Sequence, residues 1–466
     1  MKRTRALACV AVMALVVAAC SSDDAETSTT AEPDTQTTAA PATTAAPDEP
    51  ATTAGSTDTT AAETGDDNPL ADFGEDPSAA DSALVERALG PVDPPNDASW
   101  DVILASIARA NQDLDQATID KAMECWSNQE CDTGSGGELV MGWADGGGDT
   151  VNVWRGVSHM ESILQALTYP EIGTIVSTAA NFNPDPAVHA NDIRFLIQRG
   201  VDFIVGYPDV GIALGGAVSE AEAAGIPYIS YSAGYVGLPG QDGALEPGSD
   251  YTAVVGEDLC ALGQSFADVL NEGVGDGEIG ILGGTPGNAL SLGWQQCLVP
   301  ALGGGIEAVN PPADENSTTG DTVWVNSFAL DAVRGLLTTA PEIGGWAYEY
   351  ADGMYTALQA YDELGIPVEN LTVAIRTDEQ TLFCDWAERA EPTYTLWYSA
   401  GGNFQARVAV TTAMLELAGY DAPGEVIVPH VMRKVTDSDC NPDRINEVVS
   451  GTSLVPDSVL ALMFGG

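Results

Sequence analysis

Cations are scarce in this sequence. It has 16 Lys and Arg against 69 Asp and Glu, with only 3 His in 466 residues. A nucleic-acid backbone or an anionic membrane face requires a basic patch, which so few cations can hardly supply. We therefore exclude nucleic acid as a partner and interpret the acidity as a well-solvated surface. Hydrophobic residues still make up 44% of the chain, enough to build a sizeable core in two or three domains.

Catalytic and metal-binding motifs are also missing. The sequence contains no G-x-S-x-G, no G-x-x-x-x-G-K-[ST] and no H-E-x-x-H. His159, His189 and His430 are far apart in the sequence, which gives a triad or a metal cluster little support. We therefore expect no enzyme activity, no cofactor and no metal, and an exported enzyme is the weakest alternative.

Beyond the first twenty residues, no segment reaches the roughly 18 uninterrupted apolar residues of a membrane-spanning helix. At the N-terminus, cations precede an apolar run from Ala6 to Ala19, which is too short to span a bilayer and is typical of a secretory signal. The run ends in Val17-Ala18-Ala19-Cys20, which resembles a bacterial lipobox. We predict that residues 1–20 are a lipoprotein signal peptide and that lipidated Cys20 anchors an exported chain to the cell membrane. An ordinary signal peptide with a chance Cys is the alternative.

Apolar residues are absent from the next segment. Residues 21–68 contain no Val, Ile, Leu, Met or aromatic residue. Such a segment cannot bury enough apolar surface to offset its ordering entropy. We predict a disordered tether over residues 21–74, in which about 48 flexible residues give a root-mean-square reach of roughly 35–40 Å.

Six cysteines remain outside the signal. An even number in an exported chain indicates up to three disulfides, whereas a zinc site would need clustered spacing. Other connectivities are possible, but we prefer the sequential pairing Cys125–Cys131, Cys260–Cys297 and Cys384–Cys440.

Helical periodicity precedes Leu139, and a different pattern follows it. We expect short helices at 78–89, 99–110 and 115–126, within a helical extension over 75–137. Beyond it, short apolar runs alternate with amphipathic helical patterns at a period of roughly 25–33 residues, which fits the βαβ unit. The expected strands start near 139, 172, 202, 227, 252 and 279, and continue at 322–325, 346–350, 371–375, 394–398 and 426–431. About eleven strands exceed a comfortable single sheet. We therefore predict an α/β protein with two doubly wound parallel-sheet lobes.

Several sequence runs match one family in its order. Ile193–Val205 reads IRFLIQRGVDFIV, like the family's "LI-x-x-GVDAII" passage from helix to strand. Ala223–Pro227, Val254–Asp258 and Gly283–Asn288 match its next turn, its entry to a second lobe and its "G-x-x-GN" loop. The sequence thus resembles the type I solute-binding proteins of sugar ABC importers, the ribose- and galactose-binding kind, over roughly residues 138–440.

This resemblance implies two lobes that are joined by three crossings and close on a ligand. Lobe 1 would comprise 138–250 plus 401–430, and lobe 2 would comprise 251–400 plus 431–466. Ligands of such sheets bind outside the carboxyl ends of the strands, and a sugar site combines planar polar groups with aromatic faces. The candidate ligand-binding residues are Asp145, Trp154, Tyr231, Ser232, Trp294, Tyr350, Asp352, Arg376, Asp378, Tyr398 and Asn403.

Four of these candidates have open alternatives. Trp154 corresponds to the family's stacking aromatic residue but could simply pack, and Asp145 could cap a helix. Trp294 stands in the region of the family's ligand-binding Arg, or belongs to the core. Arg376 faces a ligand carboxylate or a sugar hydroxyl pair, or only neutralises Asp378 and Glu379.

The expected function is capture of a small polar solute, a sugar in the first place, and its delivery to an ABC permease. We expect a monomer that meets the membrane only through its anchor. A sensor on the same scaffold, or a non-sugar solute such as an amino acid, is the alternative.

Overall fold

The computed structural model describes the folded part of the chain, within the unit Gly65–Gly466. The described residues are 70–95, 97–111, 114–146, 152–178, 185–389, 393–399, 402–442 and 451–465. The predicted signal, Cys20 and most of the predicted tether lie outside them. The tether prediction is too long at its end, because Leu70 is fully buried and the 3₁₀ turn η1 (Ala71–Phe73) packs its Phe73 ring on Tyr420.

The first lobe is built on a seven-stranded sheet. Its order is β1-β3-β2-β4-β5-β6-β12, and all neighbours are parallel except the edge strand β1. The bounds are β1 Glu130–Asp132, β2 Leu139–Asp145, β3 Ile172–Ser177, β4 Phe203–Tyr207, β5 Tyr228–Ser230, β6 Ala253–Gly256 and β12 Glu425–Ile427. The central strands are apolar on both faces, as expected of a sheet covered on both sides.

The second lobe is built on a six-stranded sheet. Its order is β13-β11-β10-β9-β7-β8, and only the edge strand β13 is antiparallel. The bounds are β7 Gly277–Ile281, β8 Ile306–Ala308, β9 Ile343–Tyr348, β10 Thr372–Ile375, β11 Thr395–Tyr398 and β13 Arg433–Lys434. The chain passes between the two sheets after β6, after β11 and after β12, which are the three crossings that the family resemblance implies.

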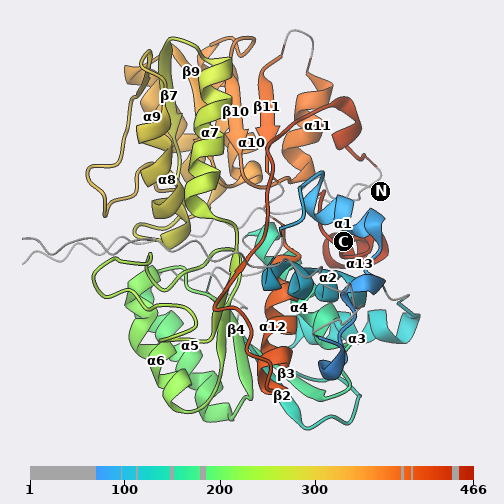
Figure 1. Ribbon diagram of the computed structural model, residues 1–466. Coiled ribbons are helices and arrows are strands. Elements are labelled where there is room, and N and C mark those ends of the chain that lie inside the picture. The colour runs from blue at the N-terminus through green and yellow to red at the C-terminus, as the bar shows by residue number, and fades with distance from the viewer. Residues whose placement is uncertain are drawn as a thin grey trace, which may run out of the picture. The chain divides into compact units, whose positions relative to one another are not determined.

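Helices cover both sheets. In Figure 1, α5 and α6 lie on one side of the first sheet, and α4 and α12 lie on the other. The first-lobe helices are α4 Val153–Ala166, α5 Pro186–Arg199, α6 Gly215–Ala223 with the 3₁₀ turn η3 Gly211–Leu214, and α12 Gln405–Leu417. The second-lobe helices are α7 Leu259–Gly273, α8 Ala289–Ala301, α9 Asn326–Thr339, α10 Ala351–Leu364 and α11 Gln380–Glu388. The two-lobed parallel α/β architecture is confirmed.

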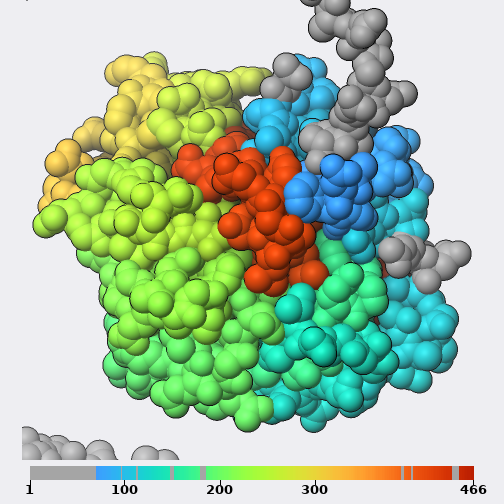
Figure 2. Space-filling model, turned by 60° about the horizontal axis from the view of Figure 1, so that its bottom comes forward, coloured from blue at the N-terminus to red at the C-terminus, as the bar shows by residue number. Residues whose placement is uncertain are grey.

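The helical extension is present and packs on the first lobe. It contains η2 Pro77–Ala79, α1 Ser82–Leu89, α2 Ala98–Ala110 and α3 Gln116–Ser127. Each α-helix begins after an Asp whose carboxylate accepts a backbone N–H of the first turn, as N-cap residues do. The red, C-terminal part of the chain lies at the surface between these blue helices and yellow-green residues in Figure 2.

Three sequence-based boundaries need correction. Strand β6 pairs with β5 and β12, so the first lobe extends through Gly256 and does not end at residue 250. Residues 322–325 form no strand but a turn with φ of 46° at Val323 and 54° at Trp324. Part of the segment assigned to the second lobe also lies elsewhere, because α13 (Asp457–Phe464) contacts α3 of the extension. Strand β13 and the 3₁₀ turn η4 (Asp437–Asp439) remain with the second lobe.

The three disulfides have the sequential pairing that we preferred. Cys125–Cys131 joins α3 to β1, Cys260–Cys297 joins α7 to α8, and Cys384–Cys440 joins α11 to the segment after η4. Within the described residues, no helix has the length and apolar character needed to cross a membrane.

Candidate ligand-binding site

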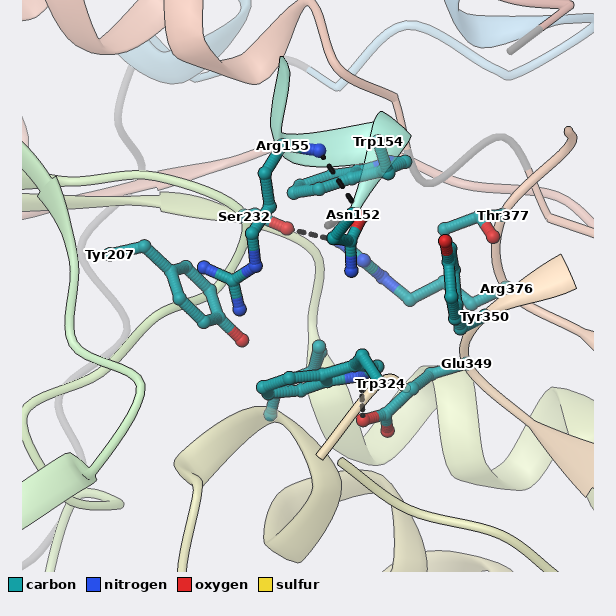
Figure 3. Close-up of a pocket in the computed structure, with 11 residues that line it drawn as sticks. Asn152, Trp154, Arg155, Tyr207, Ser232, Trp324, Glu349, Tyr350, Arg376 and Thr377 are labelled. Carbon is teal, nitrogen blue, oxygen red and sulfur yellow. Dashed lines mark hydrogen bonds between the residues drawn. The ribbon is translucent and has the colours of Figure 1, made fainter. Parts of the chain in front are cut away.

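A small pocket lies between the two lobes. Figure 3 shows side chains from both lobes converging on it. The lining residues are Asn152, Trp154, Arg155, Tyr207 and Ser232 of the first lobe, and Leu290, Trp324, Glu349, Tyr350, Arg376 and Thr377 of the second. None of them is more than 7% exposed, so the lobes are closed over the pocket.

Trp154 forms one aromatic wall at the start of α4. The Asn152 carboxamide oxygen caps this helix by accepting the Arg155 N–H (3.3 Å). The Trp154 ring stacks on Tyr231, with centroids 6.0 Å apart and planes 12° apart. Tyr231 stacks in turn on Trp143 at 5.0 Å. Because a column of rings supports it from behind, Trp154 presents a fixed apolar face to the pocket.

Trp324 forms a second aromatic wall and comes from the other lobe. The left-handed turn at Val323 and Trp324 aims the indole inward, and its Nε1 donates to the Glu349 carboxylate (2.9 Å). The Tyr207 ring of the first lobe meets it edge-on at 6.1 Å. In Figure 3 the Trp154 and Trp324 rings lie on opposite sides of the pocket. The two indoles therefore face the pocket from opposite lobes, with the Arg376 guanidinium 5.9 Å from the Trp154 ring and the Arg155 guanidinium 5.1 Å from the Trp324 ring.

Arg155 is held by two carboxylates of its own lobe. Its Nη1 donates to Asp145 and its Nη2 to Asp209, both at 2.5 Å. Tyr231 also donates its hydroxyl to Asp145. Burial opposes the charge on Arg155, but the two carboxylates outweigh it and raise the pKa of Arg155 well above its usual value. The guanidinium lies 4.7 Å from the centroid of the Tyr207 ring and stays charged in the pocket.

Arg376 pairs across the lobes. From the carboxyl end of β10, its Nη2 donates to the Ser232 hydroxyl (2.9 Å) of the first lobe and to the carboxylate of Glu257 (2.8 Å), which follows β6 at the first crossing. Burial disfavours the charged Glu257, yet Arg376 outweighs it and lowers the pKa of Glu257. The expected alternative that Arg376 neutralises Asp378 and Glu379 is therefore wrong. The Arg376 Nε is buried and has no hydrogen-bond partner among the described residues, so it remains able to donate to a ligand.

Glu349 is the acidic group of the pocket. Its carboxylate accepts from the Ser291 hydroxyl (2.6 Å), from Trp324 and from the Trp294 indole. Burial raises the pKa of Glu349, and these donors offset part of the increase. Trp294 is itself fully buried, with its ring edge-on to Phe266 at 5.3 Å. It orients Glu349 from behind and does not line the pocket.

The structure brings some of the candidates together and separates others. Those that line the pocket are Trp154, Ser232, Tyr350 and Arg376. Those that stand behind lining residues are Asp145, Tyr231, Trp294 and Asp352, the last accepting from Tyr350 (3.4 Å). Asp378 and Tyr398 instead line a separate cavity with Arg87 and Arg433. Asn403 lies at the second crossing, where its amide donates to the Trp154 carbonyl (2.7 Å).

Sequence reasoning did not select seven lining residues: Asn152, Arg155, Tyr207, Leu290, Trp324, Glu349 and Thr377. Arg155 was not selected because it lies beside Trp154 in an amphipathic helix pattern, although it is one of few cations. Trp324 was hidden because its apolar run resembled a strand. The end of β4 gave a usable signal, since Tyr207 stands at the carboxyl end of a predicted strand, where ligands bind.

Comparison with known proteins agrees with this geometry. The family model described as periplasmic binding protein domain matches residues 159–421, more than half of the chain. The protein belongs to the periplasmic binding protein domain family. Members of this family bind solutes and are not enzymes. No curated protein sequence matches the chain at a significant level.

Solved structures of the same type I fold resemble this periplasmic binding protein. An ABC transporter solute-binding protein from Mycobacterium smegmatis with bound glycerol has a TM-score of 0.52 and 20% identity, and the match covers 65% of this chain and 96% of that one. An ABC transporter periplasmic solute-binding protein from Actinobacillus succinogenes with bound D-allose has a TM-score of 0.54 and 19% identity, covering 65% and 99%. At these identities the likeness establishes the fold.

Proposed function

We propose that this protein is an exported, lipid-anchored solute-binding protein that captures a small neutral sugar and delivers it to an ABC importer. The supporting observation is the enclosed pocket between two tryptophans, Trp154 and Trp324, that come from opposite lobes. Indole faces contact the C–H surfaces of a sugar ring, while polar groups at the ring edge fix its hydroxyls. No step of the proposed function requires covalent chemistry.

The charges of the pocket favour a neutral ligand. Arg155 is already balanced by Asp145 and Asp209, and Arg376 is balanced by Glu257. Glu349 adds a further carboxylate to the wall. A sugar acid would therefore enter a site without excess positive charge, whereas a neutral sugar needs only the hydrogen bonds.

Export and membrane anchoring are part of the proposal and rest on the first twenty residues. The lipobox-like run ending at Cys20 predicts a lipid-anchored protein on the extracytoplasmic face. Two of the neighbouring structures are those of ABC transporter solute-binding proteins with bound glycerol or D-allose. Transport is favoured over the sensor alternative on this basis.

A calorimetric and thermal-shift screen tests the ligand class. The probes are D-allose, D-galactose, D-tagatose and glycerol, each sugar being paired with the matching sugar acid, and amino acids form a separate arm. A ligand at about 100 times its Kd should stabilise the protein by roughly 2.7 kcal/mol. Binding of a neutral sugar supports the proposal. If only a sugar acid or an amino acid shifts the melting temperature, the neutral-sugar assignment is wrong.

Replacing Trp324 tests the site. Trp324→Ala should reduce affinity about fivefold or more, because stacking on an aromatic face contributes about 1–3 kcal/mol. Trp386→Ala is the matched control, since this half-buried tryptophan lies in the same lobe on α11 and does not line the pocket. Equal affinity of both variants and the unchanged protein would exclude this pocket as the binding site.

A further inference from the structure

The C-terminal segment, residues 451–465, contacts both lobes. The Gly451 N–H donates to the Asp378 carbonyl (3.1 Å), and the Thr452 N–H donates to the Asp378 carboxylate (2.6 Å). Asp378 follows β10 and belongs to the second lobe. The segment lies outside the residues that match the family model. It therefore adds a connection between the lobes beyond the three crossings.

The next residues of the segment are fixed to the first lobe through Glu161 of α4. One Glu161 carboxylate oxygen accepts from the Ser453 hydroxyl (2.8 Å), the Leu454 N–H (2.7 Å) and the Val455 N–H (3.2 Å). The other oxygen accepts from Arg407 of α12. Glu161 is fully buried, so this carboxylate depends on these donors for solvation.

Apolar packing strengthens the first-lobe end only. Leu454, Val455, Val459 and Leu460 of the segment are buried, and Phe464 meets Trp126 of α3 edge-on at 6.3 Å. Figure 1 shows α13 beside the N-terminal helices. Among the described residues, the hydrogen bonds between this segment and the second lobe are the two to Asp378. When the lobes separate, the bonds to Asp378 are therefore the ones that break.

Both attachment points adjoin the pocket. Asp378 directly follows the lining residue Thr377 and is two residues from Arg376. Glu161 lies about two turns along α4 from Trp154. Movement of the second lobe onto a ligand thus also brings Asp378 onto Gly451 and Thr452.

We propose that residues 451–455 are a latch that holds the second lobe closed over the pocket. The latch is attached permanently to Glu161 and reversibly to Asp378, so it shifts the equilibrium toward the closed form and slows ligand release. Its effect on ligand release rests on the proposed function of the pocket, whereas its effect on closure does not. Asp378 and the Thr452 N–H are then determinants of affinity that do not line the pocket.

The sharpest variant removes one N–H and leaves Asp378 intact. Thr452→Pro deletes the donor to the Asp378 carboxylate, and Thr452→Val is the matched control because it keeps the N–H. As a second pair, Asp378→Ala removes the acceptor, and Asp437→Ala changes the same charge at an exposed position of η4. Each is made in the full mature chain, and unfolding curves verify that the fold is retained.

Closure is measured without any ligand. Spin labels at Gly216→Cys on α6 and Gly335→Cys on α9 report the distance between the lobes, since both glycines are exposed and an added side chain meets nothing within 4 Å. A hydrogen bond to a carboxylate corresponds to at least about tenfold in an equilibrium constant. Thr452→Pro and Asp378→Ala should therefore raise the ratio of open to closed protein about tenfold, while both controls match the parent protein.

Dissociation of the tightest-binding sugar of the panel, followed by stopped flow, should be accelerated by a similar factor in the same two variants. Unchanged label distances and unchanged dissociation in both variants would overturn the latch. If no sugar binds the parent protein, the proposed function fails while the label distances still decide the latch. If the labels show opening and sugar dissociation is unchanged, the latch does not control ligand release.

Discussion

The two lobes treat their buried charges differently. In the first lobe, Asp145 and Asp209 share Arg155, and Glu161 pairs with Arg407. In the second lobe, Glu349, Asp352 and Glu379 are buried, and the ion pairs of the described residues give none of them a cation. Arg376, the cation on the second-lobe side of the pocket, pairs instead with Glu257 at the first crossing.

This difference teaches how the pocket is assembled. The first-lobe half is complete within its own lobe, because Trp154 and Arg155 are held by Tyr231, Asp145 and Asp209 whether or not the lobes close. The second-lobe half instead reaches the first lobe through Arg376, whose Nη2 donates to the Ser232 hydroxyl. Its carboxylates rely on neutral donors, so burial raises the pKa of Glu349 and of Asp352.

The largest effect is expected from Arg155→Met. The substitution leaves Asp145 and Asp209 buried without their cation, and breaking a buried pair in this way costs about 3–5 kcal/mol. Urea unfolding should show this loss of stability. Arg194→Met is the control, because its ion pair with Glu220 is exposed and should matter far less. A change as small as the control's would mean that the first lobe does not depend on Arg155.

Glu379→Gln tests the second lobe through the pH dependence of the free energy of unfolding. Burial raises the pKa of Glu379 to about 8, and one of its oxygens has no hydrogen-bond partner among the described residues. The folded state therefore prefers the protonated acid, so this group's stabilisation is present below its ordinary pKa of 4.5 and is lost as the pH rises toward 8.

Glu379→Gln should remove that loss and increase stability at pH 8, each unit of pKa shift being worth about 1.4 kcal/mol. Unfolding free energies between pH 5 and pH 8.5 measure the effect, using the exposed Glu388→Gln as control. Parallel pH profiles of Glu379→Gln and the parent protein would contradict the prediction.

Arg376→Met should have the smallest effect on folding and act mainly on closure. When the lobes open, water can solvate Glu257, so the cost of the lost pair is limited in a way that it is not for Arg155. The radius of gyration of the ligand-free protein, from X-ray scattering, should increase, with Arg389→Met as a second-lobe control outside the pocket. If Arg376→Met lowers the free energy of unfolding as much as Arg155→Met does and leaves the radius of gyration unchanged, the two lobes do not differ in the way described.

Local pattern was sufficient for most of the fold. The recurring strand and helix periods predicted both sheets. The even cysteine count predicted up to three disulfides, and the sequential pairing that we preferred is the observed one. The turn at Val323 and Trp324 was mistaken for a strand, because its apolar run satisfies the same pattern. Nothing in the local sequence of residues 451–465 shows that they return to Glu161.

The candidate site was only partly predictable. Residues at the ends of strands, such as Ser232 and Arg376, could be found because the topology places strand ends at one edge. The pairing of Arg376 with Glu257 could not be predicted, since these residues are 119 residues apart and meet only in the folded arrangement of the two lobes. Asp145 and Tyr231 stand behind lining residues, and which side chain stands in front depends on packing that sequence alone does not give.

The disulfides have a mechanical consequence. Two of them lie within the second lobe, and the third ties the helical extension to the first sheet, so none of the three bridges of the described residues spans the opening. The disulfides thus restrain each lobe internally. Contacts between the lobes consist of hydrogen bonds and ion pairs, which can break and re-form. Oxidation of the cysteines can therefore stabilise each lobe against unfolding without linking the two lobes covalently to each other.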